Sequence, residues 1–296
     1  MQDGRGEQLL AASPAPGDHG AAGLGTFGHR FHGQPFVAVV HQLVPRGREQ
    51  RTGRAVLRRA LELGVNHIDT ADFYRSGDHT AHANTLIREA LHPYPDGLVI
   101  ATKVGPLIRP DGYSAGAPSD MRALVEENLI GLGMNRLDLV YLRVGHMEPP
   151  HGESIAARFE ALAELREEGL IRHLGLSNVD TGHLTEARAI APVTAVQNQY
   201  HAAHRADVEM LAACEEAGIA FAPFFPLGGG RELDDDRLAK VAARHRAAVA
   251  QIGLAWLLAS WLVALAIPGT GSVRHLEENM ATESVVLSDE DLADLA

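Results

Sequence analysis

The sequence predicts an α/β fold, because short β-branched runs alternate with longer amphipathic helical patterns along most of its 296 residues. Strands that are separated by helices form a parallel sheet, since each helix returns the chain to the starting edge. Polar residues follow nearly every strand-like run, as in a site built at the carboxyl ends of strands. A closed (β/α)8 barrel (a TIM barrel) and an open doubly wound sheet both fit this alternation.

Seven runs rich in aliphatic residues are expected to be strands. They are 64–68, 98–102, 137–142, 171–176, 193–197, 218–222 and 263–267. Helices are expected between and after them, at 54–63, 80–91, 119–132, 153–168, 180–190, 205–217, 234–259 (two helices), 273–281 and 288–296. Gly64, Gly169 and Gly218 stand where a helix ends, and Ser288 precedes acidic residues as an N-cap does.

The first fifty residues depart from this alternation, because they are rich in Gly, Pro and His. A weaker eighth strand is expected at 22–26, so that one barrel domain spans 21–296. Residues 1–20 are expected to be peripheral or disordered, and 29–50 to form an irregular loop before the first helix. The apolar run 35–44 within that loop is either an extra strand or a poorly ordered segment.

The charge balance excludes some classes of partner. The net charge is −12, from 38 acidic and 26 basic residues, which argues against nucleic acid as the main partner. The sequence contains no run of about 18 uncharged apolar residues, so no membrane span is expected. The N-terminus lacks a signal pattern, and Cys214 is the only cysteine. We therefore expect a cytoplasmic protein of unknown oligomeric state, without a disulfide.

The basic residues are almost all arginine: 24 Arg against two Lys, Lys103 and Lys240. A lysine in such a chain is a candidate for chemistry that needs an ammonium group. The polar side chains at or just after strand ends are Asp69, Tyr74, Lys103, Arg143, Ser177, Asn178, Gln197 and Asn198. Each has an ordinary structural explanation as a cap, a packed ring or a turn former. An ordered series of them at nearly every strand end favours a site.

Six motifs in this order resemble the aldo-keto reductase family: GVNHIDTADFY, ATK, GLSN, VQNQY, FFPLGG and IPGTGSVRHLEEN. The resemblance covers residues 53–279, with a plausible further piece at GLGTFG, 23–28. It implies a single-domain TIM barrel that uses NADP to reduce a small-molecule carbonyl. The segments NHIDTADFY, IREALHPYPD, HRAD and PFFPLGG are most similar to bacterial pyridoxal reductases, which makes pyridoxal the first substrate to consider.

The resemblance implies an Asp, Tyr, Lys and His tetrad, of which Asp69, Tyr74 and Lys103 match three members. Arg143 stands in the His position, a departure that the pyridoxal-reductase branch shares. Hydride addition to a carbonyl builds negative charge on oxygen, which needs a proton and nearby donors. Tyr74 would donate the proton, Lys103 would lower the pKa of its phenol, and Asp69 would hold Lys103. Arg143 cannot shuttle a proton, but it offers two fixed hydrogen bonds.

The resemblance also implies a cofactor site. A Gly-rich turn that runs into a helix offers free backbone N–H groups to a phosphate, and a cation there selects NADP. Gly271 departs from the Ser that is common in relatives. Phe224 is either a wall against the nicotinamide ring or a core residue. The implied cofactor residues are Gly25, Thr26, Ser177, Asn178, Gln197, Phe224, Pro226, Leu227, Gly269, Thr270, Ser272, Arg274, His275, Glu278 and Asn279.

Two other functions compete with a reductase. An NADP-binding sensor or accessory subunit with little turnover would explain Arg143 and the unusual N-terminus, but the intact Asp69, Tyr74 and Lys103 oppose it. A metal-dependent hydrolase would use His29 and His32, which lack a third ligand at a convincing spacing. We therefore expect no metal site. Substrate choice is expected to depend on the loops 106–118 and 144–152 and on the segment after Leu227.

Overall fold

A computed structural model describes residues 38–39, 48–75, 82–109, 112–145 and 152–296. All of these residues belong to one compact unit, Gln34–Ala296. The expectations for 1–20, for a strand at 22–26 with Gly25 and Thr26, and for His29 and His32 lie outside the described residues.

The described strands form a parallel sheet in the order β1-β2-β3-β6-β7-β8-β9. Their bounds are β1 Ala38–Val39, β2 His67–Asp69, β3 Val99–Val104, β6 Leu137–Arg143, β7 Ile171–Ser177, β8 Val193–Gln197 and β9 Ala220–Phe221. The sequence predicted β2, β3 and β6 to β9 to within three residues. Within the expected strand 263–267, Ala264 forms a parallel bridge with Phe221.

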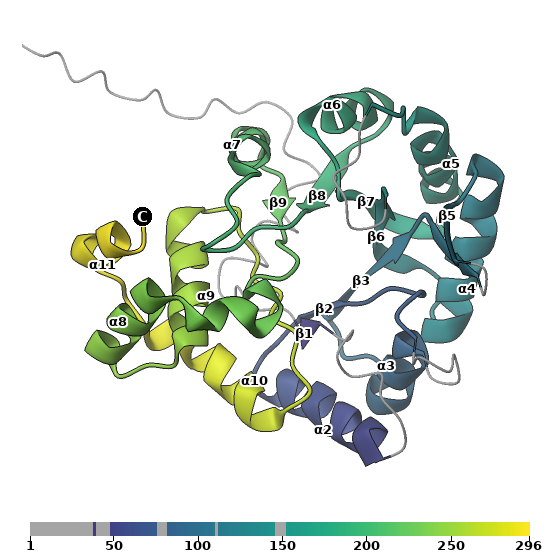
Figure 1. Cartoon of the computed structure of the whole chain (residues 1–296). Helices are drawn as coiled ribbons and strands as arrows, with labels where there is room; N and C mark the ends of the chain where they lie inside the picture. Colours follow the sequence, from purple (N-terminus) through teal and green to yellow (C-terminus); the bar gives the residue numbers. More distant parts are fainter. Residues whose placement is uncertain (1–37, 40–47, 76–81, 110–111, 146–151) are drawn as a thin grey trace, which may run out of the picture. The chain divides into compact units, whose positions relative to one another are not determined.

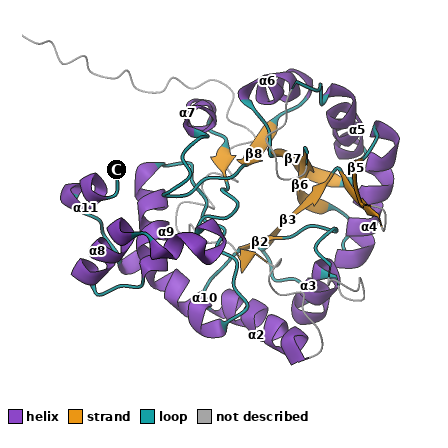
Figure 2. Ribbon diagram, in the orientation of Figure 1, coloured by secondary structure: helices purple, strands orange, loops and turns teal. Residues whose placement is uncertain are grey.

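Helices follow the strands and lie outside the sheet (Figures 1 and 2). They are α2 Arg48–Glu62, α3 Ala83–Leu91, α4 Met121–Leu132, α5 Ala156–Glu167, α6 Thr181–Ile190, α7 Val208–Ala217, α8 Asp236–His245, α9 Val249–Ser260, α10 Val273–Met280 and α11 Asp289–Asp294. Short 3-10 helices occur at Pro118–Asp120, Gly228–Asp234 and Ala281–Ser284. Among the described helices, none combines the length and apolar character needed to cross a bilayer.

Two segments before β2 differ from the expectation of an irregular loop at 29–50. Ala38 and Val39 pair in parallel with Ile68 and Asp69, so part of the apolar run is a strand. Helix α2 begins at Arg48, several residues earlier than predicted. The early residues of α2 are polar, and a prediction from apolar periodicity misses a first helical turn that contains no apolar residue.

A second difference follows β3, where the expected loop 106–118 contains a hairpin. Strands β4 (Pro106–Arg109) and β5 (Gly112–Ala115) pair in antiparallel fashion, with Arg109 opposite Gly112. The sequence between them reads Pro-Asp-Gly, a combination that favours turns and that could have predicted this hairpin. The hairpin leaves the sheet at its carboxyl edge, directly after Lys103.

Alternation along the strands divides the buried residues into two sets. Residues such as Ile68, Ile100, Val140 and Leu174 face the helices and belong to the main hydrophobic core. The opposite face carries a smaller apolar cluster of Ala101, Leu139, Tyr141 and Ala195. The strand register places Asp69, Lys103, Arg143, Ser177 and Gln197 on this second face, at the carboxyl ends.

The floor of the second face is closed by Tyr141, whose side chain is 1% exposed. Gly175 lies opposite Tyr141 in the register, and a Cβ atom there would come within 2.6 Å of the Tyr141 ring. Any larger residue at this position would therefore displace the ring. This glycine lets a large aromatic side chain fill the space below the polar strand ends.

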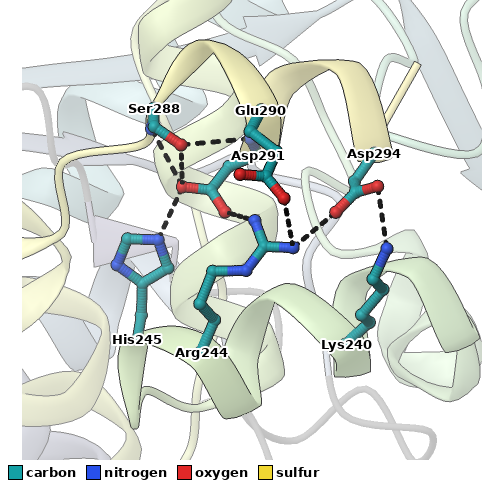
Figure 3. A network of polar contacts seen from close by, with 7 residues as sticks. All are labelled: Lys240, Arg244, His245, Ser288, Glu290, Asp291 and Asp294. Carbon is teal, nitrogen blue, oxygen red and sulfur yellow. Dashed lines mark hydrogen bonds and ion pairs between the residues drawn. The ribbon is translucent and has the colours of Figure 1, made fainter.

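The C-terminal helix α11 is joined to α8 by a network of charges (Figure 3). Arg244 contacts Asp291 and Asp294, and Lys240 donates to Asp294 at 2.9 Å. His245 Nε2 lies 2.8 Å from Asp291 Oδ2. Ser288 caps α11 as predicted, because its Oγ accepts a hydrogen bond from the Asp291 amide. Burial opposes the charge of Asp291, but hydrogen bonds from Ser288 and His245 lower its pKa well below the ordinary value.

Candidate functional site

A cavity of about 890 Å3 opens at the carboxyl ends of the strands. All four residues of the expected tetrad line it: Asp69, Tyr74, Lys103 and Arg143. The structure therefore brings these four side chains together at one cavity. The expected cofactor residues that line the same cavity are Gln197, Phe224, Pro226, Leu227, Gly269, Thr270, Ser272, His275, Glu278 and Asn279.

Asp69 and Lys103 form a buried ion pair at the bottom of this cavity. Lys103 Nζ donates to Asp69 Oδ1 at 2.5 Å and to the Thr70 carbonyl at 2.9 Å, and both side chains are 2% exposed. Burial alone would lower the pKa of the Lys103 ammonium, but Asp69 and Tyr74 raise it above the ordinary value. Lys103 therefore stays charged at neutral pH.

Tyr74 lies beside this pair, and the Lys103 ammonium is 4.9 Å from the centre of its ring. The loop after β2 holds the Tyr74 backbone, because the Tyr74 amide donates to Ala71 and the Ala83 amide at the start of α3 donates to Tyr74. Burial raises the pKa of the Tyr74 phenol above its ordinary value, while Lys103 acts in the opposite direction. The expected effect of Lys103 on the phenol pKa is therefore present, but burial, which the sequence did not indicate, has the larger effect.

Arg143 ends β6 and lines the same cavity as Tyr74. Its Nη1 donates to Ser177 Oγ at 3.2 Å, and its guanidinium lies 4.8 Å from the centre of the Phe224 ring. Burial lowers the pKa of Arg143, but the charge persists because the starting value is far above neutral. A hydroxyl on one side and an aromatic face on the other hold a planar fork in one orientation.

The three residues expected to hold a carboxamide are arranged unequally. Gln197 lines the cavity, but its Nε2 donates to Asp69 Oδ2 at 2.8 Å. Ser177 and Asn178 are buried and do not line the cavity in the described structure. Asn178 adopts a left-handed backbone with φ of 59°, and its side chain donates to the Val144 carbonyl. The strand-end positions of these three residues could be predicted from the sequence, but their present hydrogen-bond partners could not.

The far end of the cavity is bounded by the start of α10. Ser272 caps this helix by accepting a hydrogen bond from the His275 amide, and Thr270 Oγ1 accepts one from the Ser272 amide. Free amides at a helix N-terminus attract a phosphate group. Arg274 is 72% exposed and does not line the cavity, because it pairs with Glu278 at 2.7 Å and donates to His275.

Several lining residues were not singled out from the sequence, chiefly Phe73, Tyr113 and Phe225. Tyr113 is presented by the β4–β5 hairpin, and burial raises the pKa of its phenol while Arg143 opposes this rise. Phe225 is 41% exposed and has a φ of 54°, a conformation that is unusual for a bulky residue. The Pro-Asp-Gly turn could have pointed to Tyr113, and the Phe-Phe-Pro sequence could have pointed to Phe225.

Neither of the two tryptophans, Trp256 and Trp261, lines this cavity in the described structure. Trp256 is buried in the core and stacks on Tyr200 at a ring distance of 5.8 Å. Within the part of the chain that the structure describes, no three His, Cys, Asp or Glu side chains form a set that could hold a metal ion.

Comparison with known proteins identifies a single family. The model of the aldo/keto reductase family matches residues 47–296. Pyridoxine 4-dehydrogenase of Escherichia coli (strain K12) is 48% identical over 252 residues, which are 84% of this chain and 87% of that protein. A probable aldo-keto reductase of Glycine max is 30% identical over 282 residues, 83% and 79% of the two chains.

A solved structure shares the same arrangement of strands and helices. The aldo/keto reductase of Klebsiella pneumoniae in complex with NADP and acetate superposes with a TM-score of 0.74 at 27% identity. The superposition covers 88% of this chain and 89% of that one.

Proposed function

Because the chain belongs to the aldo/keto reductase family, we propose that it reduces an aldehyde with NADPH and that this aldehyde is pyridoxal. The chain is an oxidoreductase, and the observation that carries the proposal is the convergence of Asp69, Tyr74, Lys103 and Arg143 on one cavity. The 48% identity to a pyridoxine 4-dehydrogenase supports the substrate. The direct test mixes the protein with NADPH and an aldehyde panel and follows the loss of reduced-nicotinamide absorbance. An accessory NADP-binding subunit would bind NADPH without consuming it.

Three residues of the tetrad, Asp69, Tyr74 and Lys103, have separate proposed roles in the reaction. NADPH supplies the hydride when it is bound. Tyr74 donates its phenolic proton to the carbonyl oxygen, and the charge of Lys103 stabilises the phenolate that remains. Asp69 holds the Lys103 ammonium at 2.5 Å, below the Tyr74 ring. Because burial keeps the phenol protonated at neutral pH, Tyr74 carries the proton that reduction requires.

The cavity is suited to a dinucleotide, because it extends from the tetrad to the N-terminus of α10. We assign Thr270, Ser272 and His275 to the phosphate and Phe224 to one wall of the nicotinamide. Ser177, Asn178 and Gln197 are proposed to hold the carboxamide. In one arrangement, Gln197 Nε2 would leave Asp69 and donate to the cofactor instead. In the other, Nε2 would keep its hydrogen bond to Asp69, and the side-chain oxygen of Gln197 would accept a hydrogen bond from the cofactor.

Arg274 is proposed to select NADPH over NADH. Its present partner Glu278 is an exposed i,i+4 neighbour, and such a pair contributes little, so Arg274 can turn to a 2′-phosphate. We expect Arg274→Ala to reduce the ratio of NADPH to NADH affinity by about ten-fold or more, since charge-assisted bonds contribute ~1.5–3 kcal/mol. Fluorescence titration with each cofactor measures this ratio.

The matched control for this prediction is Arg122→Ala. Arg122 is also an exposed helical arginine with an i,i+4 glutamate partner, Glu126, and it contacts Glu168 as well. No residue of its helix, α4, which is described throughout, lines the cavity, whereas α10 does contribute lining residues. This variant should bind both cofactors as the wild type does. An unchanged affinity ratio in Arg274→Ala would remove Arg274 from the cofactor site.

Arg143 is proposed to recognise the ring oxygen of pyridoxal. That oxygen is next to the aldehyde and largely anionic at neutral pH, so a guanidinium can bridge the two oxygens as it bridges those of a carboxylate. The contacts of Arg143 with Ser177 and Phe224 fix the plane of this fork. The simpler alternative is that Arg143 replaces His only as a donor to the reacting oxygen.

Arg143→His should therefore lower kcat/KM for pyridoxal by at least ten-fold more than for benzaldehyde, which lacks the ring oxygen. The reason is that imidazole offers one hydrogen bond where the guanidinium offers two, and charge-assisted bonds contribute ~1.5–3 kcal/mol each. Arg143→Lys keeps the charge without the fork and should show most of the same selective loss. Equal losses on both substrates would leave Arg143 as an oxyanion donor alone.

We also propose that the sheet closes into an eight-stranded barrel that spans 21–296. The ion pair Arg59–Glu277, with Nε 2.8 Å from Oε1, joins α2 to α10, two helices that are far apart in the sequence. Leu265 donates to the Phe221 carbonyl, which starts a further strand beside β9. For the cellular location we propose the cytoplasm, where a chain with one buried cysteine, Cys214, has no need of a disulfide.

A further inference from the structure

Behind the catalytic strands lies a chain of buried hydrogen bonds that the reaction does not use directly. Thr70 Oγ1 donates to Asn84 Oδ1 at 2.9 Å, and Asn84 Nδ2 donates to Asn128 Oδ1 at 2.8 Å. Thr102 Oγ1 donates to the same Asn128 oxygen at 2.6 Å, and Asn128 Nδ2 donates to the Leu124 carbonyl. We call these four residues, Thr70, Thr102, Asn84 and Asn128, the amide network.

The amide network is buried and its polar atoms are paired. Its four side chains are at most 2% exposed, and each of their oxygens and nitrogens has a partner. They lie among the apolar residues that join the sheet to α3 and α4, such as Ile87 and Val125. A polar network in such surroundings has one favourable geometry, because any shift leaves a buried group without its partner.

Each end of the amide network is one residue from the ion pair of the cavity. Thr70 follows Asp69, and Thr102 precedes Lys103, so alternation sends the threonines to the helices and the catalytic side chains to the cavity. The Thr70 carbonyl also accepts a hydrogen bond from Lys103 Nζ at 2.9 Å. Asn84 and Asn128 therefore connect the chain next to Asp69 with the strand that carries Lys103. The distance between Asp69 and Lys103 depends on this connection.

The same helix start also holds the third catalytic residue. Ala83, next to Asn84, donates its amide to the Tyr74 carbonyl at 2.9 Å. The sequence makes room for this arrangement at Gly131 of α4, where a Cβ atom would lie 3.2 Å from the Asn84 Cβ. One turn of α3 thus contacts the backbone of Tyr74 and, through side chains, the strands that carry Asp69 and Lys103.

We propose that Asn84 and Asn128 are positioning residues that set the distance between the Tyr74 phenol and the Lys103 ammonium. This inference rests on the proposed function, since it concerns the proton donor of that reaction. The groups that face Tyr74 are Lys103, Asp69 and Arg143, and Lys103 is the nearest influence that lowers the pKa of the phenol. If the amide network is broken, Lys103 loses its fixed place and the pKa of Tyr74 rises.

The experiment compares Asn84→Leu and Thr102→Val with wild type. Thr102→Val removes only a hydroxyl and keeps the shape of the side chain, and Thr102→Ser restores the hydroxyl. We expect kcat for pyridoxal to fall about ten-fold or more in Asn84→Leu and several-fold in Thr102→Val, because small displacements of reacting groups are costly. The dissociation constant for NADPH should stay within two-fold, and Thr102→Ser should recover most of the rate.

A second readout does not depend on turnover. The NMR signal of the Tyr74 Cζ, identified by its absence in Tyr74→Phe, should titrate at higher pH in both variants than in wild type. For alcohol oxidation, which needs the phenolate, the rising limb of the pH profile should move to higher pH in the same variants. Leu91→Ala, which opens a buried site two turns along the same helix, should leave the titration and kcat near wild type.

The outcomes separate the two proposals. If neither the titration nor kcat moves in Thr102→Val and Asn84→Leu, or if Leu91→Ala has the same effects, the positioning role is wrong. Should Asn84→Leu fail to fold, the isosteric Thr102→Val decides the question alone. Wild-type protein that does not oxidise NADPH with any aldehyde would refute the proposed function, while the Tyr74 titration would still judge the amide network.

Discussion

Replacement of Tyr74 by phenylalanine is expected to lower kcat for pyridoxal by about 100-fold or more and to leave NADPH binding unchanged. The change removes one hydroxyl, and loss of a general acid costs ~10²–10⁴ in rate. The ring itself should stay in place, because it packs against Phe73 at 5.2 Å and lies beside the Lys103 ammonium. Stopped-flow or steady-state loss of NADPH measures kcat, and fluorescence titration measures binding.

Two other tyrosines sharpen this prediction. Tyr94→Phe removes a hydroxyl that donates to Leu132 outside the cavity, so its kcat should equal that of wild type. Tyr113 is the second phenol that lines the cavity. Near-normal turnover in Tyr74→Phe together with a large loss in Tyr113→Phe would make Tyr113 the proton donor.

Lys103→Met is expected to affect both turnover and folding. The variant leaves Asp69 buried with a charge and no cation, and breaking a buried pair in this way costs about 3–5 kcal/mol in the free energy of unfolding. It also removes the charge that opposes the rise in the Tyr74 pKa, so kcat should fall about 100-fold or more. Urea unfolding and steady-state kinetics measure the two effects.

Lys240→Met is the matched control, because Lys240 is the only other lysine of the chain. Its side chain is 62% exposed and pairs with Asp294, so we expect a loss of at most about 1 kcal/mol and normal kcat. The double variant Asp69→Asn with Lys103→Met should regain most of the stability, since no charge is left unpaired. Recovery of kcat in that double variant would contradict the role of Lys103 in catalysis.

The strands and helices could be predicted largely because the apolar pattern of the sequence matches the positions that are buried in the fold. The strands β3, β6, β7 and β8 are mostly buried and rich in apolar residues, and a polar residue stands at or next to the carboxyl end of each. The N-terminal segment does not show such a pattern. Its apolar run 35–44 has no alternation that sets which residues pair, and only the structure places Ala38 and Val39 beside β2.

The catalytic constellation could also be predicted, but its electrostatics could not. Strand-end position indicates that Asp69, Lys103 and Arg143 converge, since strands in a parallel sheet end at one edge. The net effect on the Tyr74 pKa depends on how much of the phenol is buried, and a sequence does not contain that quantity. The bond from Gln197 to Asp69 likewise joins residues 128 positions apart that only the folded sheet brings together.

The charges between α8 and α11 have a consequence for the order of folding. Arg244 and Asp291 are 47 positions apart, and Lys240 and Asp294 are 54 apart, so these contacts close a long loop that contains α9 and α10. Contacts between residues far apart in the sequence form late in folding, because other contacts must first order the chain between them. Interactions that are absent from the folding transition state slow unfolding without speeding folding. We therefore expect the final helix to set how long the folded enzyme lasts rather than how fast it forms.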